Sequence, residues 1–263
     1  MNIVVCIKQV PDTTEVQINP DTGTLMRDGV PSIINPFDMY AIEESLRLKE
    51  RFGGKVTAIT MGPPQARDAL LETIAMGVDE AVLLSDRAFA GSDTLATSYS
   101  LSRAISKIGP CDVIMCGKQA SDGDTAQVGP GIAECLKIPF IAFVKKIEAV
   151  DNGTARVERM MEYGYDIIET PLPAVLTVVK EINEPRLPSL RGKMRAKKYE
   201  PIRMTADELD VDRRRLGLDG SPTQVIKVFT PDLRKAGEMI SADTPEEIAR
   251  ILRTKLKEAG FAI

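Results

Sequence analysis

The chain of 263 residues contains no histidine and no tryptophan. Without histidine it cannot build the Ser-His-Asp or Cys-His arrangements that activate a nucleophile. The usual catalytic zinc sites, which bind the metal through histidine, are excluded as well. Acid–base chemistry would fall to carboxylates, lysines or a bound group, and a bound cofactor that performs the chemistry is the economical hypothesis.

Long apolar runs and closely spaced cysteines are also missing. No run is long enough to span a bilayer, and the opening segment lacks the charged start and apolar centre of a signal peptide. The formal charge of -4 gives no case for nucleic-acid binding. The cysteines Cys6, Cys111, Cys116 and Cys135 lack metal-ligand spacing. We therefore expect reduced thiols, no metal site and a cytoplasmic protein without membrane insertion.

Short β-branched segments alternate with amphipathic segments of helical length along the first half of the chain. This alternation is typical of a parallel sheet covered by helices on both faces. We predict the α/β class: a doubly wound, mostly parallel, Rossmann-like sheet of the kind that binds adenine nucleotides. Strands are expected at 2–10, 55–61, 80–84 and 112–116, and helices at 35–52, 65–76, 93–107 and 125–137.

Right-handed crossovers bring the carboxyl ends of parallel strands to one edge of a sheet. The strand ends at Lys8, Met61, Ser85 and Gly117 should therefore converge there. Because such sheets bind ligands at their carboxyl edge, this convergence is stronger evidence for a ligand site than any single motif.

Two helices have predicted inner and outer faces. The helix at 35–52 has an expected inner stripe of Ala41, Ile42, Ser45, Leu46 and Leu48. Its charged residues, Glu43 and Glu44 among them, are expected to face outward. The helix that starts near Asp93 is expected to bury Leu95, Tyr99, Leu101 and Ile105 or their close neighbours.

The stretch from Cys116 to Pro130 connects an apolar strand to a helix. Gly117 and Gly123 can take backbone angles that bulkier residues avoid. The free N–H groups of the first helical turn favour an anion such as a phosphate. A structural turn closed by an Asp or Thr N-cap is the alternative, and the spacing alone does not decide between the two.

Beyond Pro139 the pattern changes. Extended segments are expected at 141–150, 154–162, 166–170 and 174–180, a basic segment at 186–198 and a final amphipathic helix at 245–256. The irregular stretch at 199–232 is too long for an ordinary internal loop, so we expect it to lie as an arm on another subunit. An excursion at 16–27, with a turn at 19–23, is expected after the first strand.

Several motifs occur together and in order: Val5–Asp12, Asn35–Asp38, Met61–Pro63, Gly117–Ala120, Asp122–Gln127, Asn183–Arg186 and Met194–Lys198. On these motifs the sequence resembles the β subunit of electron transfer flavoproteins over nearly the whole chain. The resemblance implies an αβ heterodimer in which the α subunit carries FAD and the β subunit holds an adenine nucleotide at the strand ends. That nucleotide is a structural AMP in the ordinary branch and a second FAD in the electron-bifurcating branch.

Three features resemble the bifurcating branch: the run Asp21–Asn35, the run Ser85–Phe89 together with Asp93–Ser98, and the run Asp122–Pro130. A physical argument points the same way, because FAD has a diphosphate and AMP has one phosphate. Two helix starts, at Asp93 and at Asp124, lie at one sheet edge and could cradle two phosphates. The alternative is that Asp93 or Thr94 only caps its helix.

By resemblance, NADH would pass a hydride to the FAD of the β subunit. One electron would go to ferredoxin or flavodoxin, and the other through the α-subunit FAD to a flavin dehydrogenase of the acyl-CoA or 2-hydroxy acid type. No side chain need act as a nucleophile, so we assign no catalytic residue. A carrier subunit with AMP in the same site and a free-standing regulatory nucleotide-binding domain are the other hypotheses; the basic arm argues against the second.

Cofactor contacts are predicted at Cys6, Lys8, Asn35, Phe37, Asp38, Met61, Asp93, Thr94, Thr97, Gly117, Lys118, Gln119, Ala120, Asp122, Gly123, Asp124, Thr125, Ala126, Gln127 and Val128. Among these, Asp122 could accept a ribose hydroxyl and Lys8 could offset negative charge. Backbone donors and Thr125 are expected to meet the phosphate, because carboxylates repel it. Core positions for Cys6 and Met61, and a solvated Lys8, are the alternatives.

In the family, a recognition loop docks the partner dehydrogenase through an apolar anchor. The resemblance places Leu190 at that anchor, with Leu187, Arg191 and Met194 in the same docking surface. A leucine among basic residues suits a small hot spot with a charged rim. We expect two parts, a nucleotide-binding domain at 1–184 and, at 185–263, a recognition loop and C-terminal arm that contact the α subunit and the dehydrogenase.

Overall fold

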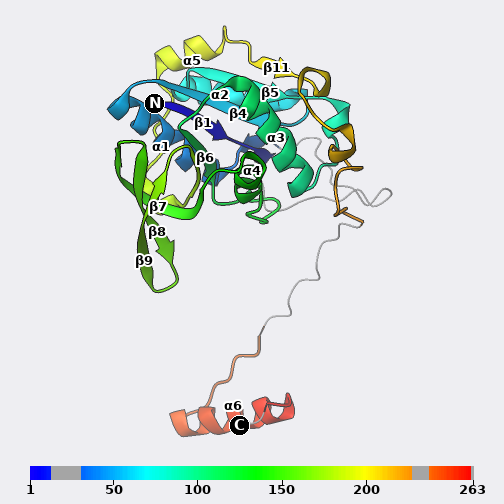
Figure 1. The fold of residues 1–263 in the computed structure, drawn as a ribbon. Helices are drawn as coiled ribbons and strands as arrows, with labels where there is room; N and C mark the ends of the chain where they lie inside the picture. Colours follow the sequence, from blue (N-terminus) through cyan, green and yellow to red (C-terminus); the bar gives the residue numbers. More distant parts are fainter. Residues whose placement is uncertain (13–30, 227–236, 262–263) are drawn as a thin grey trace. The chain divides into compact units, whose positions relative to one another are not determined.

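The structure, a computed structural model, describes residues 1–12, 31–226 and 237–261 (Figure 1). The chain divides into two compact units, Met1–Lys227 and Val228–Ile263. The predicted excursion at 16–27 lies outside the described residues.

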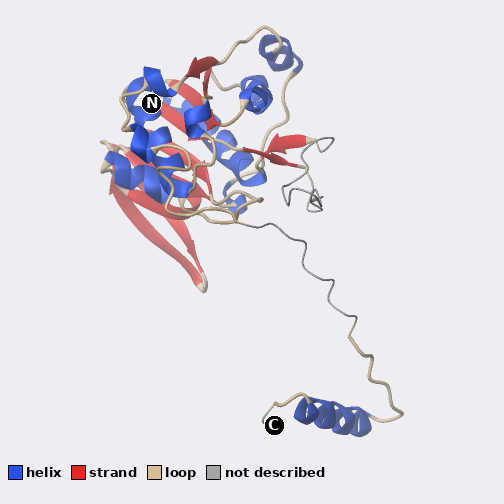
Figure 2. Cartoon of the chain, turned by 90° about the vertical axis from the view of Figure 1, so that its right-hand side faces the viewer, coloured by secondary structure: helices blue, strands red, loops and turns tan. Residues whose placement is uncertain are grey.

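Among the described residues, nine strands of the first unit form one sheet in the order β11-β5-β4-β1-β6-β10-β7-β8-β9. Neighbours from β11 to β7 pair in parallel, whereas β8 and β9 are antiparallel additions that project from the sheet (Figures 1 and 2). A mostly parallel α/β fold is thereby confirmed. The bounds are β1 Asn2–Cys6, β4 Lys55–Met61, β5 Glu80–Leu84, β6 Val113–Gly117, β7 Phe140–Asp151, β8 Thr154–Met161, β9 Gly164–Pro171, β10 Ala174–Val178 and β11 Ile202–Met204, with a separate antiparallel pair of β2 Gln9–Pro11 and β3 Ser32–Ile34.

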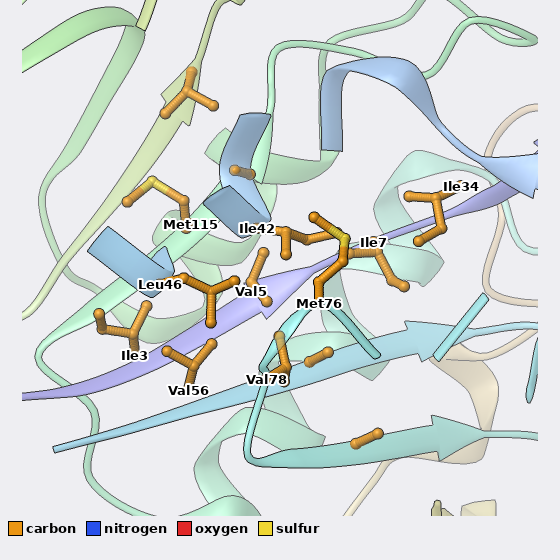
Figure 3. Close-up of a cluster of buried hydrophobic side chains, with 14 of the residues drawn as sticks. Ile3, Val5, Ile7, Ile34, Ile42, Leu46, Val56, Met76, Val78 and Met115 are labelled. Atoms are coloured by element: carbon orange, nitrogen blue, oxygen red, sulfur yellow. The ribbon is translucent and has the colours of Figure 1, made fainter. Parts of the chain in front are cut away.

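Helices cover both faces of the sheet. Side chains of α1 and α2 pack with Ile3 and Val5 of β1 on one face, and those of α3 and α4 pack with Val4 and Cys6 on the other. Figure 3 shows the first of these clusters, in which Ile3 and Val5 lie near Ile42 and Leu46 of α1. Because β1 is buried on both faces, its sequence is a continuous apolar run. The helices are α1 Pro36–Phe52, α2 Arg67–Met76, α3 Thr94–Ile108, α4 Val128–Leu136, α5 Leu190–Ala196 and α6 Pro245–Glu258, with 3-10 turns η1 Pro64–Ala66, η2 Arg87–Phe89, η3 Lys180–Ile182, η4 Ala206–Glu208 and η5 Arg213–Arg215.

The predicted outward position of Glu43 and Glu44 on α1 is wrong. Their side chains are buried, at 3% and 9% exposure. Glu43 accepts hydrogen bonds from Arg186 and Arg47, and Glu44 accepts one from Asn183. Because Arg186 and Asn183 are distant in sequence, helical periodicity alone could not predict this covered face.

On α3, the predicted burial of Tyr99, Leu101 and Ile105 is confirmed, but Leu95 is 51% exposed and its neighbour Ala96 is buried instead. Leu95 stands in the first turn of α3 and lines a surface pocket with Tyr99 and Arg215. The start of α4 was predicted at residue 125, but the helix begins at Val128. Asp124 and Ala126 both have φ of 53°, a left-handed backbone that no α-helix can continue through.

Residues 185–226 belong to the first unit. Helix α5 packs against α2 so closely that a Cβ on Gly192 would lie 2.0 Å from the carbonyl oxygen of Ala75. Strand β11 extends the sheet beside β5. Contact of this segment with another subunit stays a prediction.

In the second unit, helix α6 begins where predicted. Thr244 caps it, because its hydroxyl accepts a hydrogen bond from the N–H of Glu247 at 3.3 Å. No residue of α6 is buried. Its apolar residues, Ile248 and Leu252 among them, remain 36% and 46% exposed.

Candidate nucleotide-binding site

The sheet reverses its strand order between β1 and β6. After β1 the chain places β4 and β5 on one side, and later β6 and β10 on the other. Cys6 of β1 is paired with Cys116 of β6, so the carboxyl ends of the two strands lie side by side. Open parallel sheets bind ligands in the crevice at such a reversal.

The predicted site residues lie around this position. They stand at the end of β1 (Cys6, Lys8), the start of α1 (Asn35, Phe37, Asp38), the end of β4 (Met61), the start of α3 (Asp93, Thr94, Thr97) and the connection from β6 to α4 (Gly117–Ala120, Asp122–Val128). The hydrogen bonds described below join the first, second and last of these groups directly. Their roles as ligand contacts stay predictions.

Asn35 joins three loops of the site and is 1% exposed. Its side-chain amide donates to the carbonyl of Gln119 at 2.8 Å and accepts from the N–H of Ser121 at 3.0 Å. Its own N–H donates to the carbonyl of Lys8 at 2.8 Å. Asn35 therefore fixes the loop after β6 relative to the loop after β1.

Asp38 lies beneath the same junction and is 6% exposed. One carboxylate oxygen accepts from the N–H of Lys8 at 2.7 Å, and a Cβ on Gly117 would lie 2.4 Å from the other. Gly117 is therefore required by the close approach of Asp38, and its φ is not among the positive values that favour glycine. Burial raises the pKa of Asp38 to about 7, although hydrogen bonds from Asn35, Lys8 and Gly117 oppose the shift.

Lys8 and Asp122 form an ion pair across the crevice, with Nζ to Oδ1 at 2.6 Å. Asp122 was predicted to accept a ribose hydroxyl, and Lys8 to offset negative charge. In the structure each neutralises the other, and both are partly exposed. The pair holds the β6–α4 connection to the end of β1.

The N-terminus of α4 has no side-chain cap from the described residues, so the N–H groups of Val128 and Gly129 are open to an anion, whereas Pro130 at the third position has no N–H. The helix packs tightly against its neighbours. A Cβ on Gly129 would lie 2.6 Å from Thr177 Cγ2, and one on Gly131 would lie 2.3 Å from Ser98 Oγ. Gly129 therefore lets α4 approach β10 of the sheet, and Gly131 lets it pack closely against α3.

The N-terminus of α3 is different, because Asp93 caps it. One carboxylate oxygen of Asp93 accepts from the N–H groups of Leu95 and Ala96 at 2.9 and 3.1 Å. The other accepts from the N–H and hydroxyl of Thr223 at 3.1 and 2.8 Å. Asp93 thus caps its helix, as the alternative prediction held. The N-terminus of α3 therefore has fewer free N–H groups for an anion than that of α4.

A pocket of about 610 Å³ opens at the carboxyl ends of β4 and β5. These two strands lie on the side of β1 that is away from β6. Met61 and Gly62 line it from β4, and Ser85 to Ser92 from β5 and the following turn. Arg203 completes the wall and donates to the carbonyl of Ser85. This volume lies within the range of small-molecule sites.

The thiols of Cys6 and Cys116 face each other within the core and are 7% exposed. A hydrogen bond with Cys116, together with burial, raises the pKa of Cys6 well above its usual value. A thiol in that state is a poor nucleophile.

The predicted docking residues form an exposed group around α5. Leu187, Leu190 and Met194 are 90%, 78% and 59% exposed, and Arg191 is exposed beside them. Arg186 anchors the loop that leads to this group through ion pairs with Glu43 and Glu50 on α1. Arg186, Glu43 and Glu50 were not among the predicted docking residues, although the positive charge of Arg186 in the basic segment could have indicated an ion pair.

Phe143 is a further residue that the sequence did not indicate. Its ring lies 5.5 Å from the ammonium of Lys118 at the carboxyl edge. No motif or spacing marks it, because its position results from an irregularity in β7.

An open parallel sheet with an uncapped helix start at its strand-order reversal is the arrangement of Rossmann-like nucleotide-binding proteins. A family model described as electron transfer flavoprotein domain matches residues 22–209. The chain belongs to the electron transfer flavoprotein family, among its β subunits. Membership implies an α subunit as partner and FAD or AMP as the nucleotide.

Relatives match over nearly their full length. Identity is 53% over 253 residues to the electron transfer flavoprotein subunit beta of Thermoanaerobacterium thermosaccharolyticum, with 96% of each chain covered. It is 52% over 261 residues to the subunit beta of Clostridium acetobutylicum, covering 99% of this chain and 100% of that one. It is 49% over 259 residues to the caffeyl-CoA reductase-Etf complex subunit CarD of Acetobacterium woodii, with 98% of each covered. Within the described residues, no helix combines the length and apolarity needed to cross a membrane.

Proposed function

We propose that this β subunit binds FAD and serves an electron-bifurcating complex. The observation that supports FAD is the pocket of about 610 Å³ beside the crevice between β1 and β6. AMP needs room for one nucleoside and one phosphate, whereas FAD also needs room for an isoalloxazine ring. Met61 belongs to the predicted nucleotide contacts and also lines this pocket, so one extended ligand could use both spaces.

The bound FAD would accept a hydride from NADH and supply single electrons, to ferredoxin or flavodoxin and, through the α-subunit FAD, to a flavin dehydrogenase. The protein's own residues bind and orient. The open N–H groups of α4 suit a phosphate, and Asn35 and Asp38 hold the two loops that surround it.

The partner dehydrogenase would dock on Leu187, Leu190, Arg191 and Met194. An exposed leucine with a basic neighbour, on a loop anchored to α1, has the form of a small binding hot spot. CarD is by its name a subunit of a caffeyl-CoA reductase complex, which supports a partner that acts on a CoA thioester. The 2-hydroxy acid type is the second partner class.

The C-terminal part of the chain would contact the α subunit. Helix α6 is amphipathic and buries none of its residues, so its apolar side chains are available to a partner. Residues 185–263 thus form the proposed docking part, and residues 1–184 the nucleotide-binding part, of a cytoplasmic heterodimer.

A carrier subunit with a structural AMP is the second candidate. It is favoured by the Asp93 cap, because only one of the two helix starts is then open and AMP has one phosphate. In that case the β subunit performs no redox chemistry, and electrons enter and leave through the α-subunit FAD.

The test is the cofactor content of the purified αβ heterodimer. Flavin is released by acid and measured by absorbance, and AMP is assayed in the same extract. Two FAD and no AMP per heterodimer would support the proposal, and NADH-dependent reduction of ferredoxin would be assayed next. One FAD with one AMP would refute it.

A pocket-filling variant separates the two ligands within one scaffold. Ala90 is exposed and lines the pocket at the β5 end. The change Ala90→Trp should lower FAD content in the β subunit and leave AMP binding intact. Ala90→Ser is the control and should retain FAD. Equal FAD content in both variants would mean that the ligand does not enter this pocket.

A further inference from the structure

Strand β7 has an irregularity at the carboxyl edge of the sheet. Its register against β10 shifts between Leu176 and Val178, which leaves two β7 residues opposite Thr177. One of them is Phe143, whose N–H donates to Thr177 Oγ1 at 3.3 Å. Bulges of this kind are frequent beside functional sites, where they redirect a side chain.

The backbone at Phe143 is strained. Its φ is 59°, a left-handed conformation that glycine and asparagine adopt readily and a bulky residue rarely does. Strain at such a position persists only where the surrounding structure imposes it, and it clusters at binding and switch sites. The direction in which the Phe143 ring points is therefore the feature to explain.

The ring is directed at the ammonium of Lys118. Lys118 Nζ lies 5.5 Å from the centroid of Phe143 and 6.0 Å from that of Phe37, which is a predicted site residue at the start of α1. The Lys118 N–H donates to the carbonyl of Val178 at 2.9 Å, so its backbone is fixed between β6 and β10. Two aromatic faces thus hold one cation beside the strand-order reversal.

Lys118 differs from Lys8, the other lysine of this edge. Lys8 is neutralised by Asp122 at 2.6 Å. For Lys118, no carboxylate lies within ion-pair distance in the parts of the chain that the structure describes. Aromatic faces orient an ammonium without cancelling its charge, so Lys118 keeps its charge for a ligand.

We propose that Lys118 is the cation that meets the negative charge of the bound cofactor, and that Phe143 is a positioning residue which holds it there. The inference rests on the proposed nucleotide-binding function and holds for AMP and for FAD. The negative charge is a phosphate in either nucleotide, or the reduced ring of a flavin. Lys8 then has a structural role, that of closing the crevice through Asp122.

The experiment uses the αβ heterodimer and two readouts, the dissociation constant of the β-site nucleotide and the midpoint potential of the flavin. Lys118→Met should raise the dissociation constant for AMP or FAD about tenfold to a hundredfold, with a weaker dependence on salt, if the ammonium meets a phosphate. If it meets the flavin ring, the midpoint potential should fall instead. Both readouts unchanged would overturn the proposal.

Lys145→Met is the matched control. Lys145 also lies over an aromatic ring, 4.1 Å from the centroid of Tyr165, but it is paired with Glu158. Its loss should leave both readouts unchanged. A change as large as that of Lys118→Met would show a general charge effect and would overturn the assignment.

Two substitutions at Phe143 separate the effect of its backbone strain from the effect of its ring contact with Lys118. Phe143→Gly should raise the nucleotide dissociation constant about twofold to fivefold while the thermal midpoint does not fall, because glycine relieves the backbone. Phe143→Tyr keeps the ring and should restore wild-type affinity. A Phe143→Gly protein that binds as tightly as wild type would remove Phe143 from the site. A wild-type heterodimer that contains neither AMP nor a second FAD would overturn the proposed function and, with it, this inference.

Discussion

Asp38 should make the stability of this protein depend on pH in an unusual direction. Its pKa is raised from 3.8 to about 7 because the side chain is buried. The folded state therefore binds the Asp38 proton more tightly than the unfolded state does. The contribution of this group is fully favourable below pH 3.8 and is lost progressively as the pH rises to about 7. At 1.36 kcal/mol per unit, the loss amounts to about 4 kcal/mol as an upper figure.

The change Asp38→Asn removes the titration and keeps an amide oxygen that can accept the N–H of Lys8. The free energy of unfolding of wild type and variant heterodimers is measured with urea at several pH values between 4 and 8. Other titrating groups are common to both proteins and cancel in the difference. We expect the variant to gain about 4 kcal/mol relative to wild type across this range. If the difference in unfolding free energy between variant and wild type does not change with pH, the raised pKa of Asp38 is refuted.

Three further predictions follow from packing and exposure. Gly129→Ala should cost about 1–3 kcal/mol of unfolding free energy and weaken nucleotide binding, because the new Cβ would lie 2.6 Å from Thr177 Cγ2; adding Thr177→Ser removes that methyl and should restore both. Arg186→Met should cost about 3 kcal/mol in urea unfolding, because it removes a cation from the buried Glu43, and Arg186→Lys should recover only part since it cannot bind two carboxylates in the same fork geometry. Leu190→Ala should leave the unfolding free energy within about 0.5 kcal/mol but reduce electron transfer to the dehydrogenase about tenfold, and Val225→Ala, equally exposed outside the docking residues, should reduce neither.

The sequence predicted the part of the fold that depends on short-range pattern. The apolar strand 113–116 and the helix at 245–256 are where the pattern put them, because period and caps are local signals. The convergence of strand ends was also predictable, because the handedness of crossovers fixes it. The strand order, and with it the crevice between β1 and β6, was not predicted, because neither local pattern nor crossover handedness fixes which strands are neighbours.

The remainder depends on contacts between residues far apart in the chain. Asp93 caps α3 with one carboxylate oxygen and accepts from Thr223, 130 residues away, with the other, so its sequence context could not show that both oxygens are occupied. Glu43 appeared solvent-facing because its partner Arg186 lies 143 residues further on. Phe143 carries no sequence signal at all, because a bulge in β7 directs it to the site.

Carboxylates at the carboxyl edge of the sheet repel a phosphate unless their charge is offset. Three of them are offset by their surroundings: Asp122 pairs with Lys8, Asp93 accepts from the N–H groups of α3, and burial raises the pKa of Asp38 to about 7. Asp124 accepts a hydrogen bond from the side chain of Gln119. The uncapped start of α4 and the ammonium of Lys118 are positive features beside the strand-order reversal, and Arg87 and Arg203 line the neighbouring pocket. An acid-rich loop can therefore surround an anion, because its carboxylates are used to shape the crevice and its backbone donors are left to bind.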